Sequence, residues 1–153
     1  NIWERRRLRI MFSGEMLTGI ILASGKFFVS IKVEEKMRIG YSTKMGMDIR
    51  MDSYEFLETT HRSFQALGIK TVIKRKEGKH RPRPILRIRG AETLNTVRAL
   101  IMLNGARSLN HDESLGTFFK MLDIILKKGH RTLEGIEQIL ILKGELDGPN
   151  NNE

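Results

Sequence analysis

The stretch that most constrains the fold is residues 17–25, LTGIILASG, which combines small and large apolar residues over two helical turns. Gly19 and Ala23 lie four positions apart, so a helix would place them on one side, where a second helix backbone can approach closely. The other apolar residues leave the stretch almost no polar face: Leu17, Ile20, Ile21 and Leu22. A helix that is apolar all round is buried. The simplest interpretation is therefore a buried helix that ends at Gly25.

The same nine residues resemble the motif that names the LAGLIDADG homing endonuclease family. They agree with it at Leu17, Gly19, Ile21, Ala23 and Gly25. A strand is predicted directly afterwards, as the family's motif helix runs into its sheet. Residues 128–136 (KGHRTLEGI) are also similar to a Lys-Gly-x-His-Leu-Thr-x-Glu-Gly-Leu segment near the end of many members. The resemblance implies an α+β fold with a homing-endonuclease-like αββαββα core, an antiparallel sheet with helices on one face, and two C-terminal helices.

One position departs from the family's pattern in a way that affects chemistry. The eighth residue of the family's motif is an acid that holds the divalent metal for phosphodiester cleavage, and Ser24 stands there in this chain. A neutral hydroxyl is a weak ligand for Mg²⁺, which prefers charged oxygen atoms. The resemblance therefore implies a nucleic-acid-binding protein that has lost cleavage, with no catalytic residue, metal or cofactor. If endonuclease activity is retained it needs Mg²⁺ and another acid, for which Glu15 and Asp48 are the candidates.

A second catalytic position also departs from the pattern. Active members place a basic residue in the loop before the fourth helix of the core, near the scissile phosphate. Residues 107–113 (RSLNHDE) supply neutral or acidic side chains where a lysine is expected. Both departures favour binding without cleavage.

Apolar periodicity predicts the elements after the motif helix, which begins near Ser13 as its N-cap. Period-two alternation predicts a hairpin of two strands with these residues inward: Phe27, Val29, Ile31, Val33, Met45, Met47, Ile49 and Met51. An Asp52 cap with Glu55 three residues later predicts a helix that stops at Gly68. Strands at 69–76 and 83–89 follow, then a helix over 91–103.

The last part of the chain predicts two more helices and the domain limits. One helix covers 114–127, and another, capped by Thr132, is expected to pack on the core through Leu133, Ile136, Ile139 and Leu140. With 153 residues the chain is long enough for one domain and short for two. The expected division is a basic N-terminal arm (1–12), the LAGLIDADG-like domain (13–143) and a flexible tail (144–153). The arm's four arginines fit either a nucleic-acid contact or a solvated terminus.

Charge predicts the class of partner. The chain has 27 Lys and Arg against 18 Asp and Glu, a net charge of +9. Residues 70–89 contain nine basic residues and the single acid Glu77. Such an imbalance favours a polyanion, DNA or structured RNA. No cysteine is present and the four histidines lack zinc-site spacing, so zinc and thiol chemistry are not expected. We also expect no membrane span and no secretory signal, hence an intracellular, cytoplasmic protein.

A sheet with helices on one face leaves the other face open. Alternation assigns basic side chains to that face, including one of Lys74, Arg75 and Lys76 depending on the register. The predicted nucleic-acid contacts are Lys32, Lys44, Arg50, Arg75, Arg83, Arg87 and Arg89. One motif copy supplies half of the family's two-helix interface, which predicts a homodimer through Leu17, Gly19, Ile20 and Ala23, or a partner with a second motif. The alternatives to a noncatalytic binding protein are an active metal-dependent homing endonuclease and a structural or assembly component of a ribonucleoprotein.

Overall fold

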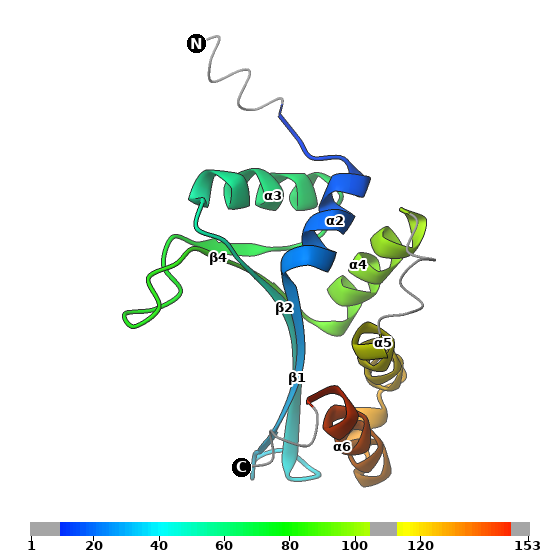
Figure 1. Cartoon of the computed structure of the whole chain (residues 1–153). Helices are drawn as coiled ribbons and strands as arrows, with labels where there is room; N and C mark the ends of the chain where they lie inside the picture. The colour runs from blue at the N-terminus through cyan, green and yellow to red at the C-terminus, as the bar shows by residue number, and fades with distance from the viewer. Residues whose placement is uncertain (1–9, 105–112, 148–153) are drawn as a thin grey trace.

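The computed structural model describes residues 10–104 and 113–147, and Figure 1 shows how their helices and strands are arranged. The elements follow the predicted order, which confirms the α+β class and the αββαββα core with two C-terminal helices. Their bounds are α2 Gly14–Ser24, β1 Gly25–Val33, β2 Tyr41–Arg50, α3 Tyr54–Ala66, β3 Val72–Lys74, β4 Ile85–Arg89, α4 Ala91–Leu103, α5 Glu113–Leu126, the 3₁₀ helix η2 Gly129–Arg131, and α6 Leu133–Asp147.

The four strands form one sheet in the order β1-β2-β4-β3, and all neighbours are antiparallel. The sheet is strongly curved, as the right-handed twist of β-strands favours. The described helices lie along its convex side, and its concave side is clear of them (Figure 1). The predicted arrangement, with helices on one face, is therefore confirmed.

A single hydrophobic cluster fills the space between the sheet and the helices. Alternation places Val29, Met45 and Met47 on the helix side, and all three are buried as predicted. On the same side the ring of Phe27 packs against Phe118 of α5, with ring centroids 4.8 Å apart. Val33 differs from the prediction: it is 76% exposed, because it is the last residue of β1 and lies beyond the core.

The motif helix α2 forms where the sequence predicts it. The Ser13 hydroxyl accepts a hydrogen bond from the Met16 backbone N–H at 3.1 Å, which caps the first turn. The helix then passes into β1 without a loop. A Cβ on Gly25 would lie 2.5 Å from the carbonyl oxygen of Ile21. Only glycine fits this close approach, which explains why the motif ends on this residue.

Several expected boundaries shift by a few residues. Ser53, rather than Asp52, caps α3 by accepting from the Phe56 N–H at 3.2 Å. The strand predicted over 69–76 is limited to β3. The last pair between β3 and β4 is Lys74 with Ile85. The next residue on the opposite strand is Pro84, which has no backbone N–H to donate, so the pairing ends there.

The two ends of the domain also differ from the predicted division. Phe12, placed in the arm, packs on α3: its N–H donates to the Ser63 hydroxyl at 2.8 Å and its ring lies 5.0 Å from that of Phe56. The α6 helix continues to Asp147, past the predicted start of the tail at residue 144. Residues 1–9 and 148–153 lie outside the described residues.

The last helix packs on the core through a different set of residues from the predicted one, since Leu142 and Leu146 also contact the core. Ile136 and Ile139 are buried, as expected, whereas Leu133 and Leu140 are exposed. None of the helices in the described ranges is long and apolar enough to cross a bilayer.

Candidate nucleic-acid interface

The strand register defines which side chains lie on the concave face of the sheet. Rows of paired residues such as Phe28, Gly46 and Arg89 run across β1, β2 and β4 on this side. The same alternation gives the face seven cations: Lys26, Lys32, Lys44, Arg50, Lys74, Arg87 and Arg89. Asp48 is the one acidic residue that these strand registers place there. The concave face is therefore strongly basic.

Five of the seven predicted contacts lie on this face: Lys32, Lys44, Arg50, Arg87 and Arg89. Arg75 does not, because its guanidinium packs over the ring of Tyr54 at the start of α3, 4.0 Å from the ring centroid. Arg83 precedes β4 and pairs with Asp52 at 2.8 Å. The register selects Lys74 from the three candidates Lys74, Arg75 and Lys76. Lys26 is not among the predicted contacts, although the period-two pattern of its strand could have identified it.

Arg89 is held across the sheet by residues of two neighbouring strands. Its Nη1 donates to Asp48 Oδ1 at 2.7 Å, and its Cζ lies 4.7 Å from the ring centroid of Phe28. Between them, a Cβ on Gly46 would come within 2.6 Å of Arg89 Nη1 and 2.8 Å of the Phe28 ring. Glycine at position 46 thus leaves the space through which the guanidinium reaches β1.

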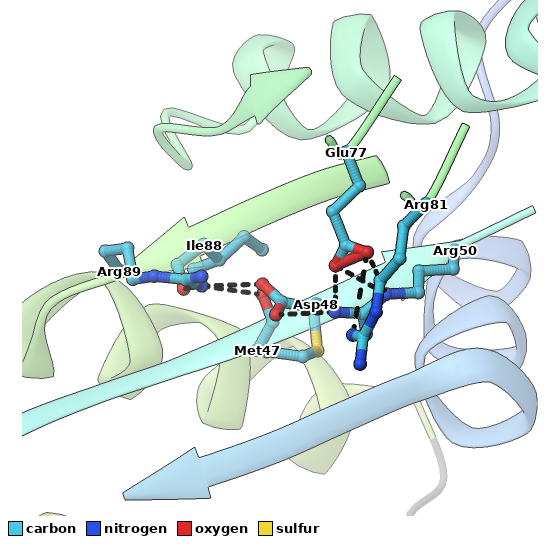
Figure 2. A network of polar contacts seen from close by, with 7 residues as sticks. All are labelled: Met47, Asp48, Arg50, Glu77, Arg81, Ile88 and Arg89. Atoms are coloured by element: carbon cyan, nitrogen blue, oxygen red, sulfur yellow. Dashed lines mark hydrogen bonds and ion pairs between the residues drawn. The ribbon is translucent and has the colours of Figure 1, made fainter. Parts of the chain in front are cut away.

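A second ion-pair group fixes the loop between β3 and β4, and Figure 2 shows both groups together. Arg50 Nε donates to both carboxylate oxygens of Glu77, at 2.9 and 3.2 Å, and its Nη2 contacts Oε1 as well. Asp48 lies 3.6 Å from Arg50, and Arg81 lies 3.8 Å from Glu77. The hydrogen bonds from Arg50 lower the pKa of the Glu77 carboxyl below its ordinary value.

This group covers one corner of the concave face. Ile85 faces the concave side in the register with Arg50 and Lys74, yet it is fully buried. The loop that carries Glu77 is tied to Arg50 at this corner. Arg50 is consequently a poor candidate for a free contact, whereas Lys26, Lys32 and Lys44 remain exposed.

The motif helix has a serine, not an acid, at position 24, where the family resemblance implies a metal ligand. Ser24 ends α2, and Glu15 lies in its first turn. Nine residues at 1.5 Å each separate them by roughly 13 Å along the helix axis. Asp48 is already paired with Arg89 and Arg50. No group of three or more potential metal ligands occurs within the ranges 10–104 and 113–147, and most of the loop expected to supply a basic residue, 105–112, lies outside them.

The exposed side of α2 is narrower than the predicted dimer interface. Leu17 and Ile20 are buried in the core of the chain itself, so of the four predicted residues only Gly19 and Ala23 are exposed. A Cβ on Gly19 would meet nothing within 4 Å. Met16 and Leu22 flank this stripe and are 42% and 40% exposed.

The curved antiparallel sheet with helices along its convex side has the fold of solved LAGLIDADG homing endonucleases. The expectation drawn from residues 17–25 is thus confirmed for the fold. In sequence, the chain matches no protein-family model and no curated protein.

The particular structures it resembles include I-TnaI, a homing endonuclease, with a TM-score of 0.74, 20% identity and 92% of each chain covered. The I-SmaMI LAGLIDADG homing endonuclease bound to cleaved DNA gives a TM-score of 0.73 at 23% identity, over 87% of this chain and 43% of that one. The meganuclease I-CpaMI bound to uncleaved DNA gives 0.73 at 23% identity, over 92% and 48%. The chain spans about half the length of the latter two.

Proposed function

We propose that this chain is a nucleic-acid-binding protein of LAGLIDADG homing-endonuclease type that grips duplex DNA or structured RNA with its concave sheet face and has lost cleavage activity. The observation that carries the proposal is the register that gathers seven cations on the helix-free face. Phosphates supply most of the affinity of such a surface, and arginine forks can also meet base edges in a groove.

The dimensions of the sheet match a duplex. β2 has ten residues, and at about 3.3 Å per residue it spans roughly 33 Å. One turn of B-DNA is about 34–36 Å long. The strand pair β1–β2 therefore has the length to follow about one helical turn, with the basic side chains along one groove.

We further propose that two chains associate through the exposed stripe of α2. Gly19 and Ala23 allow the closest approach of two helices, and Met16 and Leu22 add apolar contact area beside them. The pairing would be isologous about a two-fold axis. Two such chains together have about the size of one I-SmaMI or one I-CpaMI chain, of which this chain spans about half.

Loss of cleavage is proposed from the side chains at the end of α2. Ser24 offers no charge to a Mg²⁺ ion, Glu15 sits at the opposite end of the helix, and Asp48 is engaged by two arginines. A divalent cation at this position would lack the carboxylates that normally hold it.

The competing function is an active endonuclease, which is favoured by the structural likeness to I-SmaMI bound to cleaved DNA. Incubation with a plasmid library and Mg²⁺ tests it, since cleavage by the wild type that disappears in Glu15→Gln would establish an active site containing that acid. We expect intact plasmid in both cases.

Charge reversal on β1 tests binding by the sheet face. Lys26→Glu/Lys32→Glu should weaken binding of a 30-bp duplex or an RNA hairpin at least tenfold and flatten the salt dependence by about 1–2 units of log K against log salt. Lys120→Glu/Lys127→Glu is the control, because it makes the same charge change at exposed positions in and just after α5, on the helix side of the sheet. Equal losses in both variants would contradict the proposed face.

A further inference from the structure

Strand β2 extends beyond its neighbour β4 on one side. β4 pairs with β2 only from Gly46 onward, so residues 41–45 have β1 on one edge and no strand on the other. Gly90, just after β4, donates its N–H to the Met45 carbonyl at 3.4 Å. Because strand peptide groups alternate in direction, those of Thr43 and Tyr41 point to the same free side.

A groove runs along this free edge, between β2 and the turn that joins α5 to α6. It consists of two cavities of about 610 and 440 Å³, and both lie within the usual range of ligand sites, ~300–1,000 Å³. The cavities share Thr43, His130 and Arg131, so they are adjacent parts of one groove. One end lies at Arg89 and the start of α4, and the other lies at the β1–β2 loop around Arg38.

The charge of the groove is strongly one-sided. Its lining contains the acid Glu92 and five permanent cations: Arg38, Lys44, Arg89, Lys128 and Arg131. Lys44 and Arg89 also belong to the concave face, so the basic surface continues around the sheet edge into the groove.

Local structure holds the far wall in place. Arg38 Nη2 donates to the carbonyl oxygen of Arg131 at 3.2 Å, which ties the β1–β2 loop to η2. Thr132 then caps α6 by accepting from the Gly135 N–H at 3.0 Å. Lys128 and Arg131 are therefore presented from a fixed turn rather than from a free terminus.

Burial and the neighbouring Arg131 and Lys128 lower the pKa of His130, so this histidine is neutral at pH 7 and adds no repulsion. Its Nδ1 and the hydroxyl of Thr43 are buried without a hydrogen-bond partner among the described residues. Both residues line both cavities. The groove thus combines a net positive charge with polar atoms that remain unsatisfied.

We propose that this groove binds the phosphodiester backbone of a nucleic-acid strand that continues past the edge of the concave face. The proposal rests on the proposed function, because it extends the same ligand from the face into the groove. Phosphate is favoured over an acidic peptide by the continuity of the cations from Lys44 and Arg89 to Lys128 and Arg131. Such a contact would lengthen the footprint without adding a base-reading surface.

Duplexes of two lengths distinguish binding by the groove from binding by the concave face. A 10-bp duplex is about as long as β2, whereas a 30-bp duplex continues beyond the sheet. Lys128→Glu/Arg131→Glu should weaken binding of the 30-bp duplex about tenfold and lower its salt slope by about 1–2, while affinity for the 10-bp duplex stays within about twofold. Lys120→Glu/Lys127→Glu, whose residues do not line the groove, again controls for net charge. If the charge reversal alters the protein's melting curve, Lys128→Gln/Arg131→Gln replaces it, and a smaller loss of affinity for the 30-bp duplex is expected.

Each outcome decides between the alternatives. Equal affinity of the groove variant and wild type for the 30-bp duplex, with the Lys26→Glu/Lys32→Glu variant still weakened, would overturn the groove and leave the proposed function intact. If wild type shows no salt-dependent binding to either duplex or to an RNA hairpin, both proposals are overturned. Binding of a poly-glutamate peptide that is lost in Lys128→Glu/Arg131→Glu, without an effect on the duplexes, would assign the groove to an acidic protein partner instead.

Discussion

Arg89 on β4 donates from its Nη1 to Asp48 Oδ1 on the neighbouring strand β2, at 2.7 Å, and its guanidinium lies over the ring of Phe28 on β1. The carboxylate has two opposing effects on nucleic-acid binding. It removes one unit of positive charge from the concave face, and it fixes the orientation of an arginine fork whose geometry suits a guanine edge. Variants at the positions around Arg89 distinguish these effects.

Asp48→Asn should raise affinity for random-sequence duplexes and steepen their salt slope by about 0.9, because the face gains one net positive charge. Discrimination among sequences should decline, since Arg89 loses its charged partner. Selection of bound duplexes from a random pool, followed by sequencing, measures both quantities. Sharper sequence preference in Asp48→Asn would contradict the positioning role of Asp48.

Gly46→Ala should displace Arg89, because the new Cβ would lie 2.6 Å from its Nη1 and 2.7 Å from the Ile88 carbonyl oxygen. We expect a loss of about 1–3 kcal/mol in the free energy of unfolding, as is usual for overpacking, together with weaker duplex binding. Urea unfolding and fluorescence anisotropy measure the two effects. Gly116→Ala is the matched control, since a Cβ there meets nothing within 4 Å. Comparable losses in both variants would refute the steric argument.

The Arg50–Glu77 pair should make stability fall in acid. Because its folded-state pKa lies below the ordinary value of 4.5, Glu77 stabilises the fold fully above that pH, and this contribution is lost as pH falls through the lowered value. Wild type should therefore exceed Glu77→Gln in unfolding free energy at pH 7, and the difference should shrink as the pH falls from about 5 through the lowered pKa. A difference that grows on acidification would have the wrong sign.

Gly19→Leu should convert a dimer into a monomer, because the added side chain occupies the space needed for helix approach. The isolated chain should keep its melting temperature, since a Cβ at position 19 contacts nothing within 4 Å. Sedimentation with and without nucleic acid measures the change. If the wild type is already monomeric at micromolar concentration under both conditions, the proposed pairing is wrong.

Local patterns in the sequence predict most of the fold. The helix over 91–103 has the predicted bounds, because Gly90 precedes it and its apolar residues recur at helical spacing. The strand predicted over 69–76 extends too far at its C-terminal end, because Pro84 on the opposite strand ends the pairing after Lys74. Exposure of Leu133 and Leu140 was not predictable from periodicity alone, since it depends on how α6 is rotated against α5.

The site is predictable only in part for a similar reason. Alternation assigns residues to a face, but it does not show which cations are neutralised by carboxylates. Glu77 lies 27 positions from Arg50, and Asp48 lies 41 positions from Arg89. These pairs form only after the sheet brings the strands together, and they change which side chains remain free to bind a phosphate.

The most direct test of binding by the concave face is ultraviolet crosslinking of the chain to the nucleic acid that copurifies with it, followed by peptide mapping and sequencing of the bound strands. We expect crosslinked peptides from β1, β2 and β4, and the sequenced strands would identify the ligand as DNA or RNA. Crosslinks confined to the outer surfaces of α3 and α6, with the strands unmodified, would contradict binding by the sheet.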